Sequence, residues 1–331
     1  MKRRHFITLV GGAAVAWPLA AGGQESRRGR VVGILHYGRA DDPVTMAEIA
    51  AFKEALRRLE WIEGRNIRFE ERLTPPDSAA SRKLAKELVA LKADVIVTAA
   101  TPATAAVFAE TRTIPIVFVD ASDPIGSGFA VSLAHPDGNV TGVTNFEATV
   151  GQKWLELLKE IAPHIRRVRA IFNPKTAVNA GRYFFEPIET AARKQQIEAV
   201  ALPVLSAADI EHAIAAAADL SDVGVIGIPD VFMAQHRDLI ISLTIRHRIP
   251  YASGAVVVVR AGGLIAYDID RLDQYRRAAS FVNRILKNER PGDLPIEGPV
   301  KFKLAINLKT AKALGLEVPP SLLARADEVI E

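Results

Sequence analysis

The chain has 331 residues, of which 42 are Lys or Arg, 38 are Asp or Glu and none is Cys. Three of the basic residues, Lys2, Arg3 and Arg4, lie at the extreme N-terminus, and the 39 that remain almost balance the acidic residues. The basic residues form clusters that are too short to make a nucleic-acid-binding surface. The composition argues against nucleic-acid binding, excludes disulfides, and at 49% hydrophobic residues allows cores for two domains.

Residues 1–24 have the layout of a cleaved export signal. The basic residues are followed by a mostly apolar run at 6–21 and by small residues at 20–23. The run is too short, and too interrupted by Gly and Pro, to predict a permanent membrane anchor. Arg3-Arg4-His5-Phe6-Ile7 resembles a twin-arginine signal, and an ordinary secretory signal is the alternative. Because no Cys is present to carry a lipid anchor, the pattern predicts a free protein retained in the periplasm.

From residue 31 onward, short β-branched runs alternate with longer helical patterns, which is typical of βα units around parallel sheets. The first series predicts strands at 31–35, 67–73, 94–97 and 114–119, and helices at 43–59, 78–91 and 102–110. The second series, after 142–146, predicts strands at 168–172, 198–202 and 223–228, helices at 152–161, 183–195, 207–218 and 234–247, and an apolar run at 256–259. Two series of similar length predict an α/β fold with two Rossmann-like lobes.

The C-terminal part differs in character, with a short strand at 264–267, a helix at 272–286 and an alternating strand at 300–307. Since both series already have a full set of elements, these pieces should be added to existing sheets. The chain should therefore cross between lobes near 145, 267 and 307. The predicted division places 30–144 and about 268–300 in lobe 1, and 147–265 and about 305–331 in lobe 2, the last piece packing on lobe 2 or on the hinge. Such a multi-strand hinge should close on whatever lies between the lobes.

Polar, turn-rich loops follow six of the predicted strands. Ligands of open parallel sheets lie beyond the carboxyl ends of the strands, often near helix N-termini. We therefore expect ligand-binding side chains at Tyr37, Thr101, Ser122 and Asp123 in the first lobe, at Asn173, Asp230 and Ser253 in the second, and at Asn145, Phe146 and Tyr267 at the hinge. Their chemistry suits hydrogen bonding and stacking.

Three of these residues have a structural alternative. Thr101 directly precedes Pro102, the pattern of a helix N-cap followed by proline at the first helical position. Phe146 can simply pack the edge of a lobe. Asp120 and Asp123 can form a carboxylate pair, or one of them can cap the turn ahead of Pro124.

Several motifs, weak one by one, occur together and in order: Thr101-Pro102-Ala103, Ile114-Pro115-Ile116-Val117-Phe118, Asp123-Pro124, Gly138-Asn139-Val140-Thr141-Gly142, Pro229-Asp230 and Ile306-Asn307-Leu308-Lys309-Thr310-Ala311. With them the chain resembles bacterial ABC-transporter substrate-binding proteins of the tryptophan/tyrosine type, over essentially its whole length after the signal. The resemblance implies a type I periplasmic-binding-protein fold and delivery of a small molecule to an ABC permease in the inner membrane. We expect a monomer.

Two departures from the family concern the ligand. Where members that bind aromatic amino acids tend to carry a serine-rich loop, this chain has Lys175-Thr176-Ala177-Val178-Asn179. Where they tend to carry an acid, it has Ser253-Gly254-Ala255. Because an α-amino group needs a carboxylate partner, an aromatic or small organic acid is the first expected ligand class and an amino acid the second.

The sequence shows neither an enzyme pattern nor a metal-site pattern. After the signal it has no Gly-x-Ser-x-Gly elbow and no His-x-x-x-His pair around a carboxylate. Its histidines at 135, 164, 212, 236 and 247 are scattered, mostly beside charged residues. We therefore expect a solute-binding protein with no catalytic residue, metal or organic cofactor. A periplasmic sensor subunit that presents its ligand to a receptor is the alternative, and an enzyme on the same scaffold is a further one.

Overall fold

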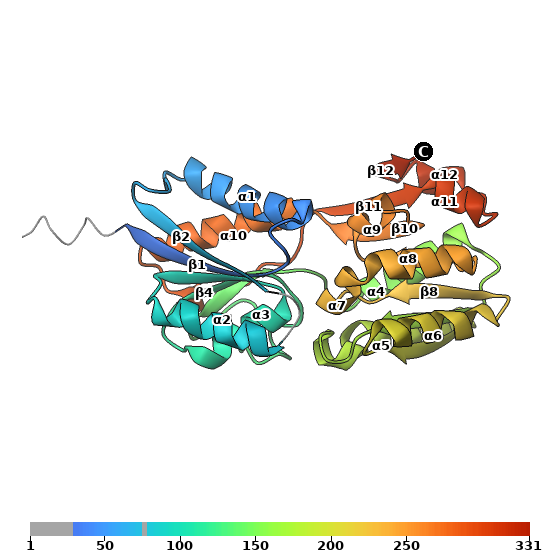
Figure 1. Cartoon of the computed structure of the whole chain (residues 1–331), viewed down its shortest axis with the longest axis horizontal. Helices are drawn as coiled ribbons and strands as arrows, with labels where there is room; N and C mark the ends of the chain where they lie inside the picture. The colour runs from blue at the N-terminus through green and yellow to red at the C-terminus, as the bar shows by residue number, and fades with distance from the viewer. Residues whose placement is uncertain (1–28, 75–77) are drawn as a thin grey trace, which may run out of the picture.

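The computed structural model describes residues 29–74 and 78–331, so the export signal predicted at 1–24 lies outside the described residues. The described part folds into two α/β lobes that lie side by side, each built on its own sheet (Figure 1). The strand order of the two sheets confirms the predicted two-lobed α/β class.

The first lobe contains a five-stranded parallel sheet in the order β2-β1-β3-β4-β5. Its strands are β1 (Arg30–Tyr37), β2 (Ile67–Thr74), β3 (Val95–Ala99), β4 (Ile116–Ala121) and β5 (Val140–Thr144). Its helices are α1 (Pro43–Arg58), α2 (Ser78–Ala90), α3 (Thr101–Glu110) and α10 (Arg271–Leu286). Helices α1 and α10 pack on one face of the sheet through Phe52, Leu56 and Phe281, and α2 and α3 cover the other face.

The second lobe contains a seven-stranded sheet in the order β12-β11-β10-β9-β8-β6-β7, which is parallel except between β10 and β11. Its strands are β6 (Arg167–Phe172), β7 (Glu198–Pro203), β8 (Val223–Gly227), β9 (Tyr251–Ser253), β10 (Ile265–Ile269), β11 (Phe302–Asn307) and β12 (Glu328–Ile330). Its helices are α4 (Val150–Ile161), α5 (Arg182–Lys194), α6 (Ala207–Ala218), α7 (Val231–Gln235), α8 (Arg237–Arg246), α9 (Val256–Arg260), α11 (Leu308–Ala313) and α12 (Pro320–Leu323). Two short 3-10 turns, η2 (Val178–Gly181) and η3 (Pro291–Asp293), complete the ordered elements.

Three chain segments connect the lobes. The first follows β5 and leads into α4, and the second is the short step from β10 to α10 at Asp270. The third lies between Glu297, which still bridges to Val143 of the first lobe, and Phe302. The crossing predicted near 307 is therefore wrong, because β11 pairs along its whole length with β10 inside the second sheet.

Local sequence explains where the helices that flank the boundary between the lobes begin. Helix α1 starts at Pro43, and the Asp42 side chain caps it by accepting a hydrogen bond from the Thr45 N–H. Helix α10 is capped in the same way by Asp270, which accepts from the Asp273 N–H. Both helix starts therefore lie at fixed positions next to the other lobe.

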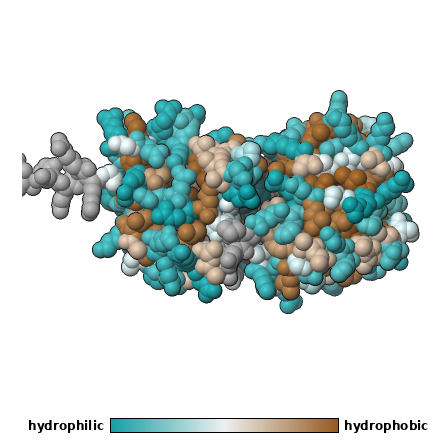
Figure 2. All heavy atoms as spheres, viewed as in Figure 1, coloured by the Kyte–Doolittle hydropathy of each residue, from teal (hydrophilic) through white to brown (hydrophobic). Residues whose placement is uncertain are grey.

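We searched the helices of the described residues for one that could span a membrane. No helix among residues 29–74 and 78–331 is both long and apolar enough to cross a bilayer. Figure 2 shows hydrophilic residues over much of both lobes in this view, with smaller hydrophobic patches between them.

Candidate functional site

A cavity of about 500 Å³ lies between the two lobes and takes lining residues from both. Its walls include the carboxyl ends of β1, β3 and β4 in the first lobe and of β8 and β9 in the second, together with the start of α10. This is the edge of a parallel sheet at which ligands bind in open α/β folds. The volume falls in the range of small-molecule sites.

On the first-lobe wall, side chains from three neighbouring strand ends form one hydrogen-bonded chain. The Ser122 N–H donates to the Thr101 hydroxyl at 2.9 Å, and the Ser122 hydroxyl donates to Asn145 Oδ1 at 2.7 Å. Thr101 does not cap α3, because it is the first helical residue and the preceding Ala100 has no capping side chain. The N-cap alternative for Thr101 is thus wrong, and its hydroxyl instead fixes the loop after β4.

On the second-lobe wall, Asp230 holds two loops together. Its carboxylate accepts from the Met233 N–H at 2.8 Å, which caps α7, from the Asn173 N–H at 2.9 Å, and from the Thr176 hydroxyl at 3.0 Å. Burial raises the pKa of Asp230 to about 6, although these hydrogen bonds act in the opposite direction. Asp230 therefore lines the cavity with both carboxylate oxygens already engaged.

This raised pKa predicts a pH-dependent stability. The native state binds the Asp230 proton more tightly than the unfolded chain does, so the contribution of this group grows as the pH falls through about 6 and is complete below about 4. Between pH 7 and pH 5, urea titrations should show the unfolding free energy of wild type rising by about 1 kcal/mol relative to that of Asp230→Asn.

Asp209 provides the control for that comparison. The hydrogen bond from the Leu205 N–H lowers the pKa of Asp209, so this carboxylate stays ionised in both states over the same range. The difference between wild type and Asp209→Asn should accordingly not change between pH 7 and pH 5. A wild-type advantage over Asp230→Asn that shrinks on acidification would show that the Asp230 pKa is not raised.

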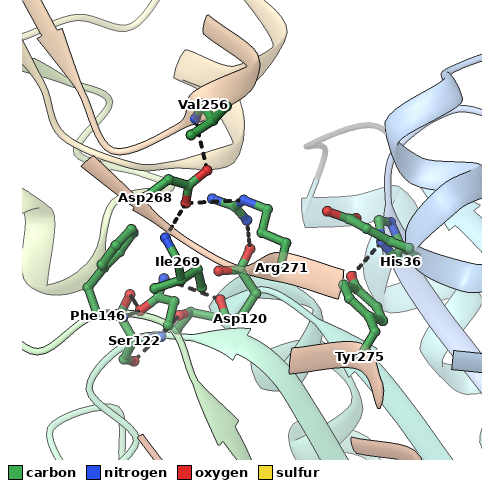
Figure 3. A network of polar contacts seen from close by, with 12 residues as sticks. His36, Asp120, Ser122, Phe146, Val256, Asp268, Ile269, Arg271 and Tyr275 are labelled. Atoms are coloured by element: carbon green, nitrogen blue, oxygen red, sulfur yellow. Dashed lines mark hydrogen bonds and ion pairs between the residues drawn. The ribbon is translucent and has the colours of Figure 1, made fainter. Parts of the chain in front are cut away.

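At the hinge side of the cavity, Arg271 lies between two carboxylates, as Figure 3 shows. Its guanidinium donates a short hydrogen bond to Asp120 at the end of β4 and lies 3.6 Å from Asp268 on β10. Asp268 also accepts from the N–H groups of Val256 and Ile269, at 2.9 and 2.8 Å. Burial raises the pKa of both Asp120 and Asp268, whereas the two carboxylates outweigh burial at Arg271 and raise its pKa.

Beside this group, His36 connects helix α1 to helix α10. Its Nε2 atom lies 3.0 Å from a Glu48 carboxylate oxygen and 2.7 Å from the Tyr275 hydroxyl. Burial raises the pKa of Tyr275 well above its ordinary value, so the phenol is un-ionised. The three side chains form a second polar group in the cavity wall.

Within the described residues, four buried side-chain atoms have no hydrogen-bond partner, and three of them belong to residues that line the cavity. These are His36 Nδ1, Asp120 Oδ1 and Arg237 Nε; the fourth is Gln274 Oε1. Arg237 Nε lies 3.5 Å from Asp238 without hydrogen-bond geometry. Buried polar atoms in proteins are normally paired, so this concentration of unpaired atoms is typical of a site that acts on something outside the chain.

The structure brings six of the ten predicted site residues to the cavity: Tyr37, Thr101, Ser122, Asn145, Asp230 and Ser253. Asp123 and Asn173 are not among its lining residues. The Asp123 carboxylate accepts from the Gly126 N–H within its own turn, as the capping alternative has it. The Asn173 side chain, 4% exposed, accepts from the Lys175 N–H in the same manner.

The two aromatic residues predicted at the hinge also lie elsewhere. Phe146 is 1% exposed and packs edge-on against Trp154 and Phe184 in the core of the second lobe. Tyr267 stacks on Phe302 across the β10–β11 pair, with ring centroids 5.3 Å apart. Neither ring lines the cavity, because each is occupied by an aromatic neighbour in its own lobe.

Four polar residues on the hinge side of the cavity were not predicted from the sequence: Glu48, Asp268, Arg271 and Tyr275. Glu48 lies within α1, and Arg271 and Tyr275 lie on α10, so a rule based on loops after strands passes over them. The contact between Arg271 and Asp120 joins residues 151 positions apart. The available sequence signal was the pair of N-cap residues Asp42 and Asp270, which place the starts of α1 and α10 at the boundary between the lobes.

Two parallel-sheet lobes joined by three segments around a cleft of ligand size define the class of type I periplasmic binding proteins. The chain belongs to the family described as ABC transporter substrate binding protein, whose model matches residues 40–330. The family resemblance stated from the sequence is thereby confirmed. This is a family of substrate-binding proteins.

Known proteins similar to this chain agree with that family. A protein named tyrosine-binding protein from Clostridioides difficile (strain R20291) is 25% identical over 267 residues, which cover 80% of this chain and 76% of that protein. A conserved domain protein from Vibrio cholerae, solved by crystallography, is 27% identical with a TM-score of 0.84, covering 91% of this chain and 99% of that one. A domain from Streptococcus pneumonia in complex with L-Trp has a TM-score of 0.84 at 24% identity, with 91% and 100% coverage.

Proposed function

We propose that this chain is the solute-binding component of an ABC importer, exported to the periplasm, where it works as a monomer without catalysing a reaction. It captures a small organic molecule between its lobes and delivers it to a permease in the inner membrane. Family membership supports the transport role. The predicted export signal supports the location.

The observation that carries this proposal is the cavity of about 500 Å³ between the lobes, with unpaired polar atoms of His36, Asp120 and Arg237 buried at its lining residues. Leaving such atoms without partners lowers stability, by about 1–3 kcal/mol for each neutral group. A ligand that supplies the missing partners would recover part of that free energy, so binding and closing of the lobes would be coupled.

Closure follows from the way the lobes are joined. In the residues that the structure describes, three short segments connect the lobes, after β5, at Asp270 and between Glu297 and Phe302. Small changes of backbone angles there can rotate one lobe against the other. A ligand that touches both walls favours the closed state by as much as its contacts differ between the two states. Tyr37, Thr101, Ser122 and Asn145 are the proposed contacts on one wall, and Asp230 and Ser253 those on the other.

We propose an aromatic ligand. Tyr37, Tyr251 and Tyr275 line the cavity together with apolar residues of α7 and α9. The relatives named for tyrosine and solved with L-Trp support the same class. The expectation that ranked acids ahead of amino acids assumed a cleft without a carboxylate for an amino group; Glu48, Asp120 and Asp268 line it, so that assumption does not hold.

A thermal-shift screen of residues 25–331 tests the proposal. The panel comprises aromatic amino acids, aromatic amines, aromatic acids, purines and sugars, because a ligand that binds only the folded state raises its melting temperature. We expect a rise with one aromatic class and recovery of that compound unchanged. Chemical conversion of the bound compound would contradict a pure binding role, and a panel without any ligand would contradict the proposed ligand class.

A further inference from the structure

Three carboxylates surround a single guanidinium on the hinge side of the cleft. Glu48, Asp120 and Asp268 all line the cavity, and Arg271 is the cation among them. Arg271 contacts Asp120 and Asp268, whereas Glu48 contacts the imidazole of His36 and adds to the negative potential at Asp120. This cluster, made of Glu48, Asp120, Asp268, Arg271 and His36, is the acidic wall.

The acidic wall carries an excess of negative charge whichever form His36 takes. With all three carboxylates ionised, the formal charge of the wall is −2 when the imidazole is neutral and −1 when the imidazole is protonated. Two of the other cations at the cavity pair with carboxylates of their own, Arg260 with Glu328 and Lys303 with Asp270, while Arg237 lies 3.5 Å from the exposed Asp238. Of the described lining cations, Arg271 alone makes an ion pair with a carboxylate of the acidic wall, and Arg260 adds only a longer-range positive potential at Asp268. Burying such a charge without a partner costs several kcal/mol.

Two atoms of the acidic wall lack a partner. Asp268 is fully engaged, because it accepts from two backbone N–H groups in addition to its contact with Arg271. Asp120, in contrast, uses Oδ2 for Arg271 and the Oδ1 atom is buried and unpaired. His36, only 4% exposed, has an unpaired Nδ1 atom. Among the three carboxylates of the acidic wall that the structure describes, Asp120 is therefore the one with an unpaired buried oxygen.

We propose that Asp120 is the seat for a protonated amine of the ligand, so that the solutes captured by this cleft are aromatic amines, whether or not they also carry a carboxylate. An ammonium group supplies up to three donors and the missing positive charge, and its hydrogen bond to a carboxylate is charge-assisted. A metal ion is the poorer fit, because no three His, Asp or Glu side chains in the described residues are grouped to hold one. The inference rests on the proposed solute-binding function and names its ligand class.

The test compares three compounds that share one ring system: tryptamine, tryptophol and indole-3-acetate. Calorimetric titration of residues 25–331 should show the amine binding about tenfold or more tightly than the neutral alcohol, since a hydrogen bond to a charged group contributes about 1.5–3 kcal/mol. The acid should bind more weakly than the alcohol. Titration with ammonium chloride alone is the control for specificity. A site for any small cation would bind ammonium as well as tryptamine, whereas a site for an organic amine would not.

Asp120→Asn removes the charge with little effect on the backbone. Asp120 has a φ of 58°, a left-handed conformation that Asn tolerates and most residues do not. The amide oxygen can still accept from Arg271. Tryptamine affinity should fall about tenfold or more, and tryptophol affinity should stay within about twofold. Asp123→Asn is the matched control, because Asp123 also has a left-handed φ, of 45°, and lies outside the cavity; tryptamine binding should not change.

Three results would contradict the proposal that Asp120 binds a protonated amine of the ligand. The first is tryptophol or indole-3-acetate binding as tightly as tryptamine, and the second is equal tryptamine affinity in Asp120→Asn and Asp123→Asn. The third is no tryptamine binding at a concentration where another compound of the wider screen binds; solute capture would then stand and only the amine class would fail. If Asp120→Asn does not fold, Glu48→Gln should weaken tryptamine binding severalfold and leave tryptophol unchanged.

Discussion

Truncating Phe146 to alanine should lower the free energy of unfolding by about 3–4 kcal/mol. Phe146 is 1% exposed, and its ring lies 5.4 Å from that of Trp154 and 6.3 Å from that of Phe184, centroid to centroid. The truncation would leave a cavity in the core of the second lobe and remove two aromatic contacts. Urea titration of the wild type and the variant measures the loss.

A second substitution separates packing from ligand stacking. Phe146→Leu keeps most of the apolar volume, so it should cost less stability than the alanine variant and leave ligand affinity within about twofold. Phe302, 38% exposed, is the control, since Phe302→Ala opens no closed cavity and should cost much less than Phe146→Ala. A large loss of ligand affinity in Phe146→Leu with stability retained would instead place Phe146 in the binding site.

Replacing Arg271 with methionine should cost about 2–4 kcal/mol of stability. The substitution keeps the apolar part of the side chain and leaves Asp120 and Asp268 without their cation. Removing one partner of a buried ion pair is strongly destabilising because the other charge stays behind. The expected loss is below that of a fully buried pair, since a quarter of the Arg271 side chain is exposed.

The control is an exposed ion pair of similar chemistry. Arg182 pairs with Glu186 on α5 with both side chains mostly exposed, so Arg182→Met should change stability by less than about 1 kcal/mol. Combining Arg271→Met with Asp120→Asn and Asp268→Asn should recover part of the lost stability. Neither of the two former partners of Arg271 then carries a negative charge. A triple variant no more stable than Arg271→Met would contradict uncompensated charge as the main cause of the loss.

Periodicity in the sequence predicted most helices and strands because each buries one face against a neighbour in its own lobe. It failed where contacts between residues far apart in the sequence determine the local structure. The strand β5 (Val140–Thr144) was not predicted, since its five residues carry no alternation and it is held by β4. The β-branched run 256–259 forms helix α9, whose first N–H is held by Asp268 from another strand.

For the site, the rule that ligands lie at strand ends identified the correct loops but not the direction of each side chain. Asn173 and Asp230 follow neighbouring strands β6 and β8, yet only Asp230 lines the cavity, because the Asn173 side chain turns back to its own backbone. The same rule could not predict the acidic wall. It exists only because α10, late in the chain, packs beside α1 and β4.

Capture of a solute by closure of the two lobes is tested most directly by single-molecule energy transfer between the lobes. The chain has no Cys, so Ala105→Cys on α3 and Thr190→Cys on α5, both exposed, give one label in each lobe. With the ligand found in the screen, we expect the distribution of transfer efficiencies to shift to one new state and to return when the ligand is removed. Saturating ligand that leaves the distribution unchanged would contradict closure on a ligand in the cleft.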